Sequence, residues 1–492
     1  MKKAVIIGAG FGGLALAIRL QAAGIPTVVL EQRDKPGGRA YVYQDQGFTF
    51  DAGPTVITDP SALEELFTLA GKRLADYVTL LPVKPFYRLC WESGKTLDYD
   101  NDSAGLEAQI ARFNPRDVEG YRKFLAYSQA VFQEGYLRLG TVPFLSFRDM
   151  LSAGPQLLKL QAWQSVYQAV SRFIEDEHLR QAFSFHSLLV GGNPFATSSI
   201  YTLIHALERE WGVWFPKGGT GALVDGMVRL FRDLGGELEL NAKVTQIEVQ
   251  DNRARQVTLA DGRTFAASAV ASNGDVVNTY KKLLGKSAIG QKRATTLTRK
   301  KMSNSLFVLY FGLNQPHPQL AHHTICFGPR YEALIHDIFN GATLADDFSL
   351  YLHSPCVTDP TLAPPGCGSF YVLAPVPHLG NAPLDWSVEG PRLRERIFDY
   401  LEARYMPGLR EQLVTHRMFT PEDFRDTLDA HLGSAFSLEP LLTQSAWFRP
   451  HNRDSDITNL YLVGAGTHPG AGVPGVVGSA KATARLMLED LQ

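Results

Sequence analysis

The sequence predicts an α/β protein in which a discontinuous domain built on a parallel sheet joins a second, mixed α+β domain. Three observations lead to this fold class. The chain has 492 residues, which is too long for one simple core. It opens with an apolar strand pattern that runs directly into a glycine-rich turn. A second strand pattern with a glycine-rich turn lies near the other end, so we expect both ends to belong to one domain.

Composition and charge exclude several classes of protein. Hydrophobic residues make up 45% of the chain and charged residues 20%, which is typical of a folded globular protein. The formal net charge of −2 gives no reason to expect a nucleic-acid partner. The cysteines show no CxxC spacing, so we expect neither disulfides nor structural zinc, and a reducing compartment. They are Cys90, Cys326, Cys356 and Cys367.

No segment predicts a membrane span. Only Met1, Lys2 and Lys3 precede the first apolar run, which is too short for a secretory signal. No uninterrupted apolar stretch approaches the roughly 20 residues that a membrane-spanning helix needs. We therefore expect a protein of the cytoplasmic side, peripheral to a membrane where it contacts one.

The N-terminal pattern is that of a dinucleotide-binding unit. Residues 4–7 form a continuous apolar run, the form taken by a parallel strand that is buried on both faces. The run leads into GAGFGG, which satisfies G-x-G-x-x-G, and a helical pattern follows to about Gly24. A second strand pattern at residues 27–30 ends in Glu31. The order strand, glycines, helix, strand and acid predicts a Rossmann-like domain.

Each residue of this pattern has a physical role. Gly8 permits the tight turn, Gly10 lets the backbone approach a pyrophosphate, and Gly13 allows close packing of helix on strand. The helix N-terminus offers free N–H groups to the phosphates. Glu31 can accept hydrogen bonds from an adenosine ribose. A glycine-rich turn without a ligand is the alternative interpretation.

Two stretches after this pattern distinguish between the dinucleotides. They are KPGGR at residues 35–39 and GFTFDAGP at residues 47–54. With them the sequence resembles the flavin amine oxidase and phytoene desaturase superfamily. The resemblance implies that FAD is the cofactor, that Arg39 contacts its phosphate or ribityl region, and that the turn at Pro54 lies near the flavin. A solvated loop arginine is the alternative for Arg39.

The C-terminal segment narrows the resemblance. A strand pattern at residues 459–463 opens into GAGTHPGAGVPGVVG, and a helical pattern runs from Ser479 to about Leu491. The N-terminus of that helix would stabilise the negative charge of a flavin that has accepted a hydride. This stretch resembles the signature of bacterial carotenoid desaturases, although Ala465 replaces an acid that binds the ribityl chain in most of the superfamily. The implied cofactor contacts are Gly464, Gly466, Val473, Pro474, Gly475 and Val476.

The middle of the chain completes the predicted domains. Residues 243–274 read as antiparallel strands, a ribbon that related flavoproteins insert into the FAD domain, where Val244 would touch the adenine through its backbone. Stretches at 193–195 and 211–220 also resemble bacterial carotenoid desaturases. We therefore expect an FAD-binding domain of residues 1–85, 212–282 and 456–492. Residues 86–211 and 283–455 would form a domain that binds substrate and associates with a membrane.

Two segments are candidates for membrane contact. Residues 143–163 are rather apolar. They could form an amphipathic patch at a membrane-facing substrate entrance. The alternative, which we favour, is a helix that packs in the core. Residues 281–301 hold eight basic side chains and no acidic ones. They would either bind an anionic membrane surface or form a solvated face.

The resemblance implies the chemistry. FAD would take hydride from a long, apolar, phytoene-like isoprenoid and introduce successive double bonds. The positive charge left on the substrate spreads over its conjugated system, so a dry and well-shaped tunnel matters more than a strong base. Arg148 and Asp149 are the acid–base candidates, because they are charges within an apolar stretch, and an exposed or locally paired couple is the alternative. His186, His353 and His468 lack metal-ligand spacing, so we expect no metal.

The same residues bear on the electron acceptor and on two alternative functions. No second G-x-G-x-x-G follows a strand, so electrons are expected to leave to oxygen or a quinone instead of a nicotinamide. An amine oxidase is one alternative, but we find neither an aromatic cage nor a flavin-proximal lysine for a charged amine. A non-catalytic prenyl-lipid binder of the same fold is another. The intact glycine motifs, Glu31 and Arg39 argue against it.

Overall fold

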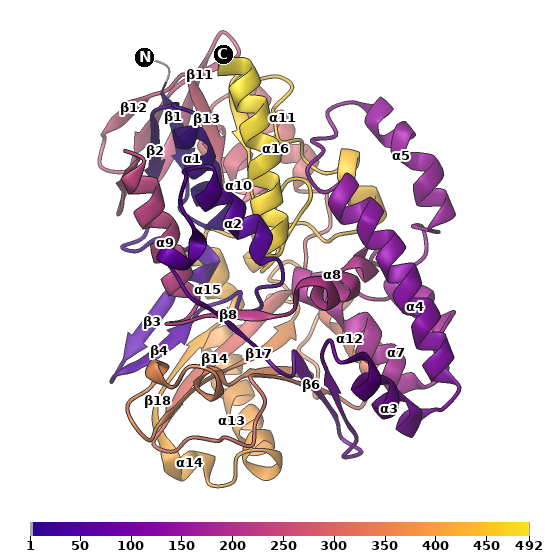
Figure 1. Cartoon of the computed structure of the whole chain (residues 1–492). Helices are drawn as coiled ribbons and strands as arrows, with labels where there is room; N and C mark the ends of the chain where they lie inside the picture. Colours follow the sequence, from indigo (N-terminus) through magenta and orange to yellow (C-terminus); the bar gives the residue numbers. More distant parts are fainter. Residues whose placement is uncertain (1–2, 492) are drawn as a thin grey trace.

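A five-stranded parallel sheet lies in the upper part of the molecule in Figure 1. The computed structural model describes residues 3–491. The strand order is β19-β13-β1-β2-β9, so strands from both ends of the chain lie side by side. The strands are β1 (Ala4–Ile7), β2 (Thr27–Leu30), β9 (Glu237–Glu239), β13 (Ala269–Ser272) and β19 (Leu460–Leu462). All neighbouring pairs are parallel.

Helices cover one face of this sheet, and a β-ribbon with shorter helices covers the other. The first face packs on α1 (Phe11–Ala22), α2 (Pro60–Thr68), α9 (Thr220–Asp233) and α16 (Val473–Leu491). The second face packs on β10 (Val244–Gln250), β11 (Arg253–Leu259), β12 (Thr264–Ala266), α10 (Val276–Asn278) and α11 (Ala288–Leu297). Burial on both faces explains why β1 and β2 are continuously apolar.

The antiparallel ribbon follows the predicted pattern with one difference. Asp251 and Asn252 form its first turn with φ of 51° and 54°, a conformation that these two residue types tolerate. The sequence suggests one strand over residues 266–270. In the structure β12 ends at Ala266, and β13 begins at Ala269 in the parallel sheet. The chain leaves the ribbon here because the apolar run 269–272 can be buried on both faces only between β1 and β19.

A seven-stranded sheet with the order β18-β14-β17-β16-β15-β6-β7 forms the lower part of the molecule. Only the β6–β15 pair is parallel. Its strands are β6 (Tyr87–Trp91), β7 (Thr96–Tyr99), β14 (Ser305–Leu313), β15 (His323–Phe327), β16 (Leu350–His353), β17 (Gly368–Val376) and β18 (Leu413–Phe419). Nearby helices are α12 (Tyr331–Asn340), α13 (Trp386–Arg404), α14 (Leu409–Gln412) and α15 (Pro421–Asp426). Two small hairpin-like sheets pair β3 (Val42–Asp45) with β4 (Phe48–Asp51), and β5 (Leu80–Pro82) with β8 (Trp214–Pro216).

A helical lobe lies beside both sheets, at the right of Figure 1. It consists of α3 (Ser103–Phe113), α4 (Asp117–Phe132), α5 (Phe147–Lys159), α6 (Val166–Ser171), α7 (Glu177–Ser184) and α8 (Leu203–Trp211). α5 lies at its outer edge. Within residues 3–491, none of the helices combines the length and apolar character that crossing a membrane requires.

The C-terminal helix begins earlier than the sequence suggests. The prediction started it at Ser479, whereas α16 begins at Val473. Pro474 lies in its first turn, where the missing N–H of proline costs no helical hydrogen bond. The glycine-rich stretch before Ser479 is therefore partly helix, and the first turn of α16 carries Val473 and Val476.

Candidate cofactor and substrate site

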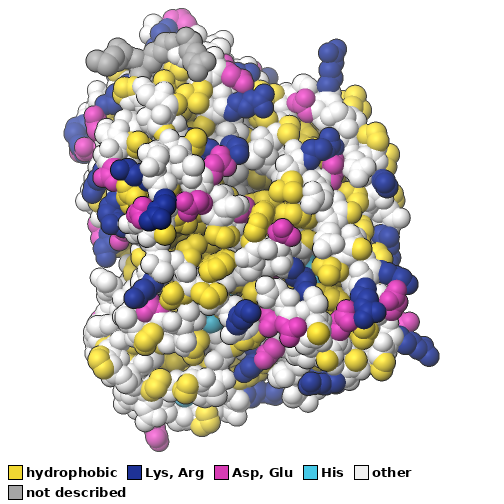
Figure 2. All heavy atoms as spheres, viewed as in Figure 1, with side chains coloured by type: hydrophobic (Ala, Val, Ile, Leu, Met, Phe, Trp, Pro, Cys, Tyr) yellow, Lys and Arg dark blue, Asp and Glu magenta, His cyan; other side chains and the backbone are white. Residues whose placement is uncertain are grey.

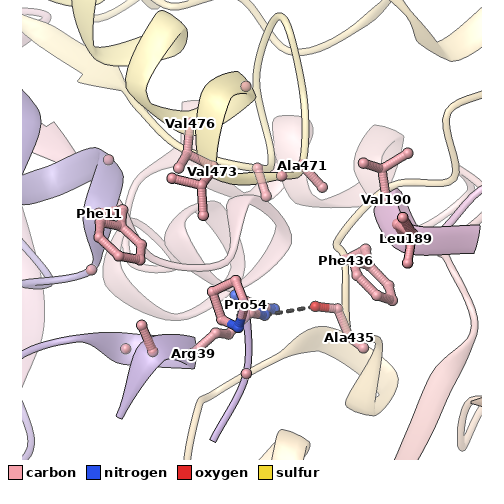
Figure 3. A pocket seen from close by; sticks show the side chains of 18 of the residues that line it. Phe11, Arg39, Pro54, Leu189, Val190, Ala435, Phe436, Ala471, Val473 and Val476 are labelled. Atoms are coloured by element: carbon pink, nitrogen blue, oxygen red, sulfur yellow. Dashed lines mark hydrogen bonds between the residues drawn. The ribbon is translucent and has the colours of Figure 1, made fainter. Parts of the chain in front are cut away.

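One continuous cavity of about 580 Å³ runs between the parallel sheet, the seven-stranded sheet and the helical lobe. At one end its wall contains Gly8, Glu31 and Val244. The first turn of α16 and Pro54 face each other across its middle (Figure 3). Its other end lies among apolar side chains of α8, β15 and β16. A cavity of this extent can hold a dinucleotide at one end and a hydrocarbon at the other.

The N-terminal glycines let β1, α1 and the segment at Gly464 pack closely against one another. Gly8 has φ of +95°, which favours glycine, and Gly10 directly precedes α1. A Cβ at Gly13 would lie 2.1 Å from the carbonyl oxygen of Gly8, so only glycine allows α1 this close to β1. A Cβ at Gly12 would lie 3.1 Å from Cα of Gly464. The two ends of the chain therefore meet at this turn.

Glu31 is held in place by backbone N–H groups at the cavity wall. Its carboxylate accepts hydrogen bonds from the N–H of Ala9 at 2.8 Å and of Arg33 at 3.0 Å. Its side chain is buried, and burial raises the pKa of the carboxyl group although these hydrogen bonds oppose the shift. The carbonyl of Glu31 accepts from the N–H of Ala242, which brings the start of the ribbon and Val244 to the same wall. This is the side-chain and backbone pair that the sequence suggests for the adenosine.

Arg39 reaches across the cavity. Its Nε donates to the carbonyl oxygen of Ala435 at 2.6 Å, and its Nη2 to that of Ser434 at 3.4 Å (Figure 3). Desolvation by burial lowers the pKa of Arg39, and Asp275 nearby acts in the opposite direction. The guanidinium thus faces the cavity while it ties the KPGGR turn to the second half of the chain. Contact with FAD phosphates stays a prediction.

The first turn of α16 points into the middle of the cavity. Figure 3 shows Val473 and Val476 above Pro54, with Phe11 on one side and Phe436 on the other. Gly472, directly before the helix, has φ of +93°. The earlier helix start therefore places the free N–H groups of α16 at the cavity wall, where they stabilise negative charge.

Arg449 supports the loop before α16, and sequence reasoning missed it. The side chain is 2% exposed, and desolvation by burial lowers its pKa. Its guanidinium donates to the carbonyl oxygens of Ala465 at 2.7 Å and Thr467 at 3.1 Å. It also donates to the carbonyls of Leu438 and Gln444. No motif marks this arginine, because its partners are backbone carbonyls, which any residue type supplies.

The predicted cofactor residues fall into two groups. Those on the cavity wall are Gly8, Gly10, Glu31, Arg39, Val244, Val473, Pro474, Gly475 and Val476. Those behind it are Gly13, Gly464 and Gly466. In the second group a Cβ would meet other parts of the backbone or side chains, at 2.5 Å from Asn273 for Gly464 and 2.8 Å from Val276 for Gly466. The structure therefore gives these three glycines a packing role next to the wall.

The side chain of Asp51 links the stretch 47–54 to the stretch 211–220. Its Oδ1 accepts a hydrogen bond from the N–H of Thr220 at 2.9 Å, at the start of α9. Burial raises the pKa of its carboxyl group to about 6, while hydrogen bonds to the helix N-terminus oppose this. The turn at Pro54 and the stretch 211–220 thus meet in space. Both lie far apart in the chain, and only the fold shows their contact.

Arg148 and Asp149 lie in the first turn of α5, outside the cavity wall. The Oδ2 atom of Asp149 accepts a hydrogen bond from the N–H of Ser146 at 3.0 Å, as part of a capping box. Arg148 is exposed. Their neighbours Phe144 and Met150 do line the cavity. The capping contact accounts for the position of Asp149, and an acid–base role for either residue stays a prediction.

Three buried histidines form a cluster that the sequence spacing did not reveal. His322, His323 and His353 each offer a ring nitrogen within 4.8 Å of the others, which is a donor set that a metal ion can use. The Nε2 atoms of His322 and His353 lie 3.0 Å apart, in hydrogen-bond contact. His322 Nδ1 contacts Thr358 Oγ1 at 2.6 Å, and His323 Nδ1 contacts the Tyr351 hydroxyl at 2.7 Å. Burial lowers the pKa of all three, to about 3 for His322, so the imidazoles are neutral.

The groups that line the cavity fit FAD. Its wall combines glycines, backbone N–H groups and the buried carboxylate of Glu31, which are the kinds of group that a pyrophosphate and a ribose require. The chain belongs to the flavin containing amine oxidoreductase family, whose model matches residues 11–488. It is an FAD-dependent oxidoreductase, as the sequence suggested.

Similar proteins narrow the family further. The chain is 85% identical to a phytoene desaturase (lycopene-forming) of Pseudescherichia vulneris, over the full length of both chains. It is 76% identical, again over the full length of both, to a protein of the same name from Pantoea ananas. An oxidoreductase from Methanosarcina mazei has a similar structure, with a TM-score of 0.68 and 17% identity, over 98% of this chain and 100% of that one. The mixed α/β fold is therefore that of this family.

Proposed function

We propose that this chain introduces successive double bonds into phytoene and forms lycopene, with FAD as the hydride acceptor. The observation that carries the proposal is the continuous cavity, which joins the cofactor end to an apolar lobe without a barrier. Full-length identity of 85% to a lycopene-forming phytoene desaturase supports the same substrate.

The residues of the chain act by binding, orientation and exclusion of water. FAD, when bound, accepts a hydride from the substrate. The apolar lobe holds a hydrocarbon in place and keeps water from the positive charge that develops on its allylic carbons. The first turn of α16 stabilises the negative charge that collects at the other reactant. Arg148 and Asp149 remain the acid–base candidates that the sequence suggests, at a position next to the wall.

The division into two domains supports this arrangement. Residues 1–85, 212–282 and 456–492 would form the Rossmann-like FAD-binding domain, and the strands of the parallel sheet all fall within these ranges. Residues 86–211 and 283–455 would form the substrate domain, which holds the strands of the seven-stranded sheet. The substrate would then lie between the two.

We further propose that the protein binds a membrane surface through α5. Phe147, Leu151 and Leu158 lie on one face of this helix and are 49%, 61% and 64% exposed. Met150 and Leu157, on the adjacent face of the helix, line the cavity. α5 thus separates the cavity from solvent, as an entrance for a membrane-dissolved substrate would require. Hydrophobic side chains reach the surface in this region at the upper right of Figure 2.

The basic run at residues 281–301 adjoins this apolar face. Lys300 donates to the carbonyl of Phe448, whose neighbour Trp447 packs against Phe147 with ring centroids 5.1 Å apart. Some charges of the run are neutralised by ion pairs, for example Arg293 with Asp456. Lys282 and Lys301 are paired as well, with Asp429 and Glu439, and the remaining basic side chains of the run would attract anionic lipid. A quinone in that membrane, or oxygen, would accept the electrons from the flavin.

The test is conversion of phytoene in liposomes by the purified, FAD-loaded protein. We expect pigments up to lycopene, identified by chromatography and absorption spectra. A parallel incubation with primary amines should leave the flavin oxidised. Oxidation of amines with unchanged phytoene would instead indicate an amine oxidase. Purification without any flavin absorbance, with retained binding of prenyl lipids, would indicate a non-catalytic binder.

A further inference from the structure

One carboxylate lies in the apolar lobe of the cavity. Glu208 is on α8, and its helix neighbours Leu203, Ile204 and Leu207 also line the lobe. The side chain of Glu208 is 0% exposed. Phe185 of the preceding segment lies on the same wall. A carboxyl group therefore lies where the rest of the wall is built to hold a hydrocarbon.

The other acids on the cavity wall differ from Glu208 in position and in partners. Glu31 lies at the nucleotide end, and Asp275 faces Arg39. Asp429 forms an ion pair with Lys282. Within residues 3–491, no lysine or arginine forms an ion pair with Glu208. Among residues 3–491 its one ion-pair partner is His186, which carries a charge only when protonated.

Two polar side chains contact this carboxylate. The hydroxyl of Tyr87 donates to Oε1 at 2.7 Å. Nε2 of His186 lies 3.1 Å from Oε2 but off the direction of a hydrogen bond, so Oε2 has no hydrogen-bond partner in the described chain. His186 is itself buried and packs edge-on against Tyr87. Oε2 therefore keeps an unused lone pair, and the imidazole of His186 lies beside it.

An arrangement of this kind is costly for folding. Burying a carboxylate with incomplete hydrogen bonds and only a histidine as ion-pair partner opposes folding, and such groups cluster at functional sites. Packing alone would be served better by glutamine or an apolar residue at position 208. The cost and the location together indicate a role toward the substrate.

We propose that Glu208 accepts the proton released in each desaturation, with His186 as a positioning residue beside its Oε2. This inference rests on the proposed function. One C–H bond of the substrate breaks and its electron pair leaves with hydrogen as hydride, which the flavin accepts. The neighbouring C–H bond then breaks, its electron pair becomes the new C=C bond, and its proton moves to Oε2 of Glu208. The substrate thus loses two hydrogens and two electrons, as one hydride to the flavin and one proton to Glu208.

The carboxylate also stabilises the substrate between these two events. A fixed negative charge beside the allylic cation lowers its energy strongly, because the surroundings are apolar and screen little. Glu208 is suited to both tasks because it lies on the wall itself, whereas Arg148 and Asp149 lie outside it. Successive double bonds require that the carboxylate be deprotonated again after each one.

The test compares Glu208→Gln with Glu210→Gln, a change of the exposed glutamate two residues further along α8. We expect Glu208→Gln to retain its flavin absorbance and its affinity for phytoene in liposomes, because its shape and the cofactor end are unchanged. Its thermal midpoint should be equal or higher, since a buried uncompensated charge is removed. The rate at which phytoene reduces the flavin in a single anaerobic turnover should fall at least about a hundredfold. Glu208→Asp should recover part of this rate, and Glu210→Gln should keep all of it.

A second variant tests the same idea if Glu208→Gln does not fold. Tyr87→Phe removes the hydrogen bond to Oε1 that orients the carboxylate of Glu208. The rate of flavin reduction by phytoene should then fall roughly tenfold while the affinity for phytoene is kept. A residue that only packs would leave this rate unchanged.

The outcomes separate the two proposals. If the wild type leaves phytoene unchanged, the proposed function fails and the role of Glu208 falls with it. If the wild type converts phytoene and folded Glu208→Gln reduces flavin equally fast, the proposed function stands and the role of Glu208 is refuted. A folded Glu208→Gln that loses only phytoene affinity would also refute it, because the residue would then serve binding alone. An unchanged rate of flavin reduction in Tyr87→Phe counts against it as well.

Discussion

The two ends of the cavity are built in different ways. The cofactor end is made of backbone, with glycines at Gly8 and Gly10, N–H groups of two helices, and one carboxylate held by main-chain donors. The apolar lobe of the cavity, where we propose that the substrate binds, is made of side chains from α8, β15, β16 and the segment at Phe185. A backbone site needs glycine at set spacings along one stretch of chain, so it leaves a motif. A side-chain lobe needs only apolar volume, which many sequences supply.

The two ends of the cavity also differ in which residues tolerate substitution. At the cofactor end a single added Cβ collides with fixed backbone, as at Gly13. In the lobe an apolar side chain can be exchanged for another of similar volume at small cost. The polar exceptions in the lobe, above all Glu208, are therefore the informative positions there.

Gly10→Val should have the largest effect and tests the backbone nature of the cofactor end. A side chain at this position would fill the cavity wall, with its Cβ 3.0 Å from Nδ2 of Asn273, so almost all flavin should be lost while the circular dichroism of the protein is kept. The measurement is flavin absorbance per mole of purified protein. Gly154→Ala is the control, since a Cβ there meets nothing within 4 Å. A yellow and fully active Gly10→Val would place the cofactor elsewhere.

The double variant Leu151→Glu/Leu158→Glu tests whether the protein binds a membrane surface through α5. Loss of two exposed leucines should cost on the order of 3 kcal/mol of membrane binding, which is about a hundredfold in partitioning. Cosedimentation with vesicles that contain anionic lipid measures it. Val388→Glu, at a position that is 42% exposed in α13, should change nothing. Equal binding of the double variant would move the membrane-facing surface away from α5.

The pH dependence of stability tests the histidine cluster beside the lobe. The pKa of His322 is about 3 in the folded protein and about 6.5 in an unfolded chain, so the unfolded chain binds more protons between these values. The corresponding stability is complete above about pH 6.5 and is lost as the pH falls, by about 2 kcal/mol at pH 5. Denaturant unfolding of His322→Gln should lack this part of the loss.

The wild type serves as reference because other groups act in the opposite direction. Burial raises the pKa of Asp51 to about 6 and of Glu439 to about 7, which favours folding as the pH falls. The difference between variant and wild type isolates His322. His336→Gln, a change of an exposed histidine, should keep the wild-type slope. An unchanged slope in His322→Gln would show that its imidazole is charged in the folded state.

The smallest expected effect concerns metal at the same cluster. The hydrogen bonds to Thr358, to Tyr351 and between His322 and His353 explain the position of the rings, so we expect no stoichiometric metal. Elemental analysis of the purified holoprotein measures this, and chelators should leave phytoene conversion unchanged. About one equivalent of zinc that disappears in His323→Gln would instead make the cluster a metal site.

Much of the cofactor end was predictable from sequence. The bounds of β1 and β2 agree with the predicted strands, because a continuous apolar run between turn residues has few other solutions in an α/β protein. The start of α16 was predicted six residues late. Glycine and proline lower helix propensity in any local reading, but the packing of Val473 and Val477 into the core offsets this. Arg449 left no sequence signal, since its partners are main-chain carbonyls.

The sequence by itself determined the cofactor, the family resemblance and the convergence of the two chain ends, because each depends on residue types at short and set spacings. Only the tertiary structure decided which charged residues face the substrate lobe and which histidines meet. Glu208 and Asp149 look equally polar along the chain, yet one lies buried on the cavity wall and the other caps an outer helix. The physical reason is that burial and contact across strands are properties of the packed chain, and no local spacing encodes them.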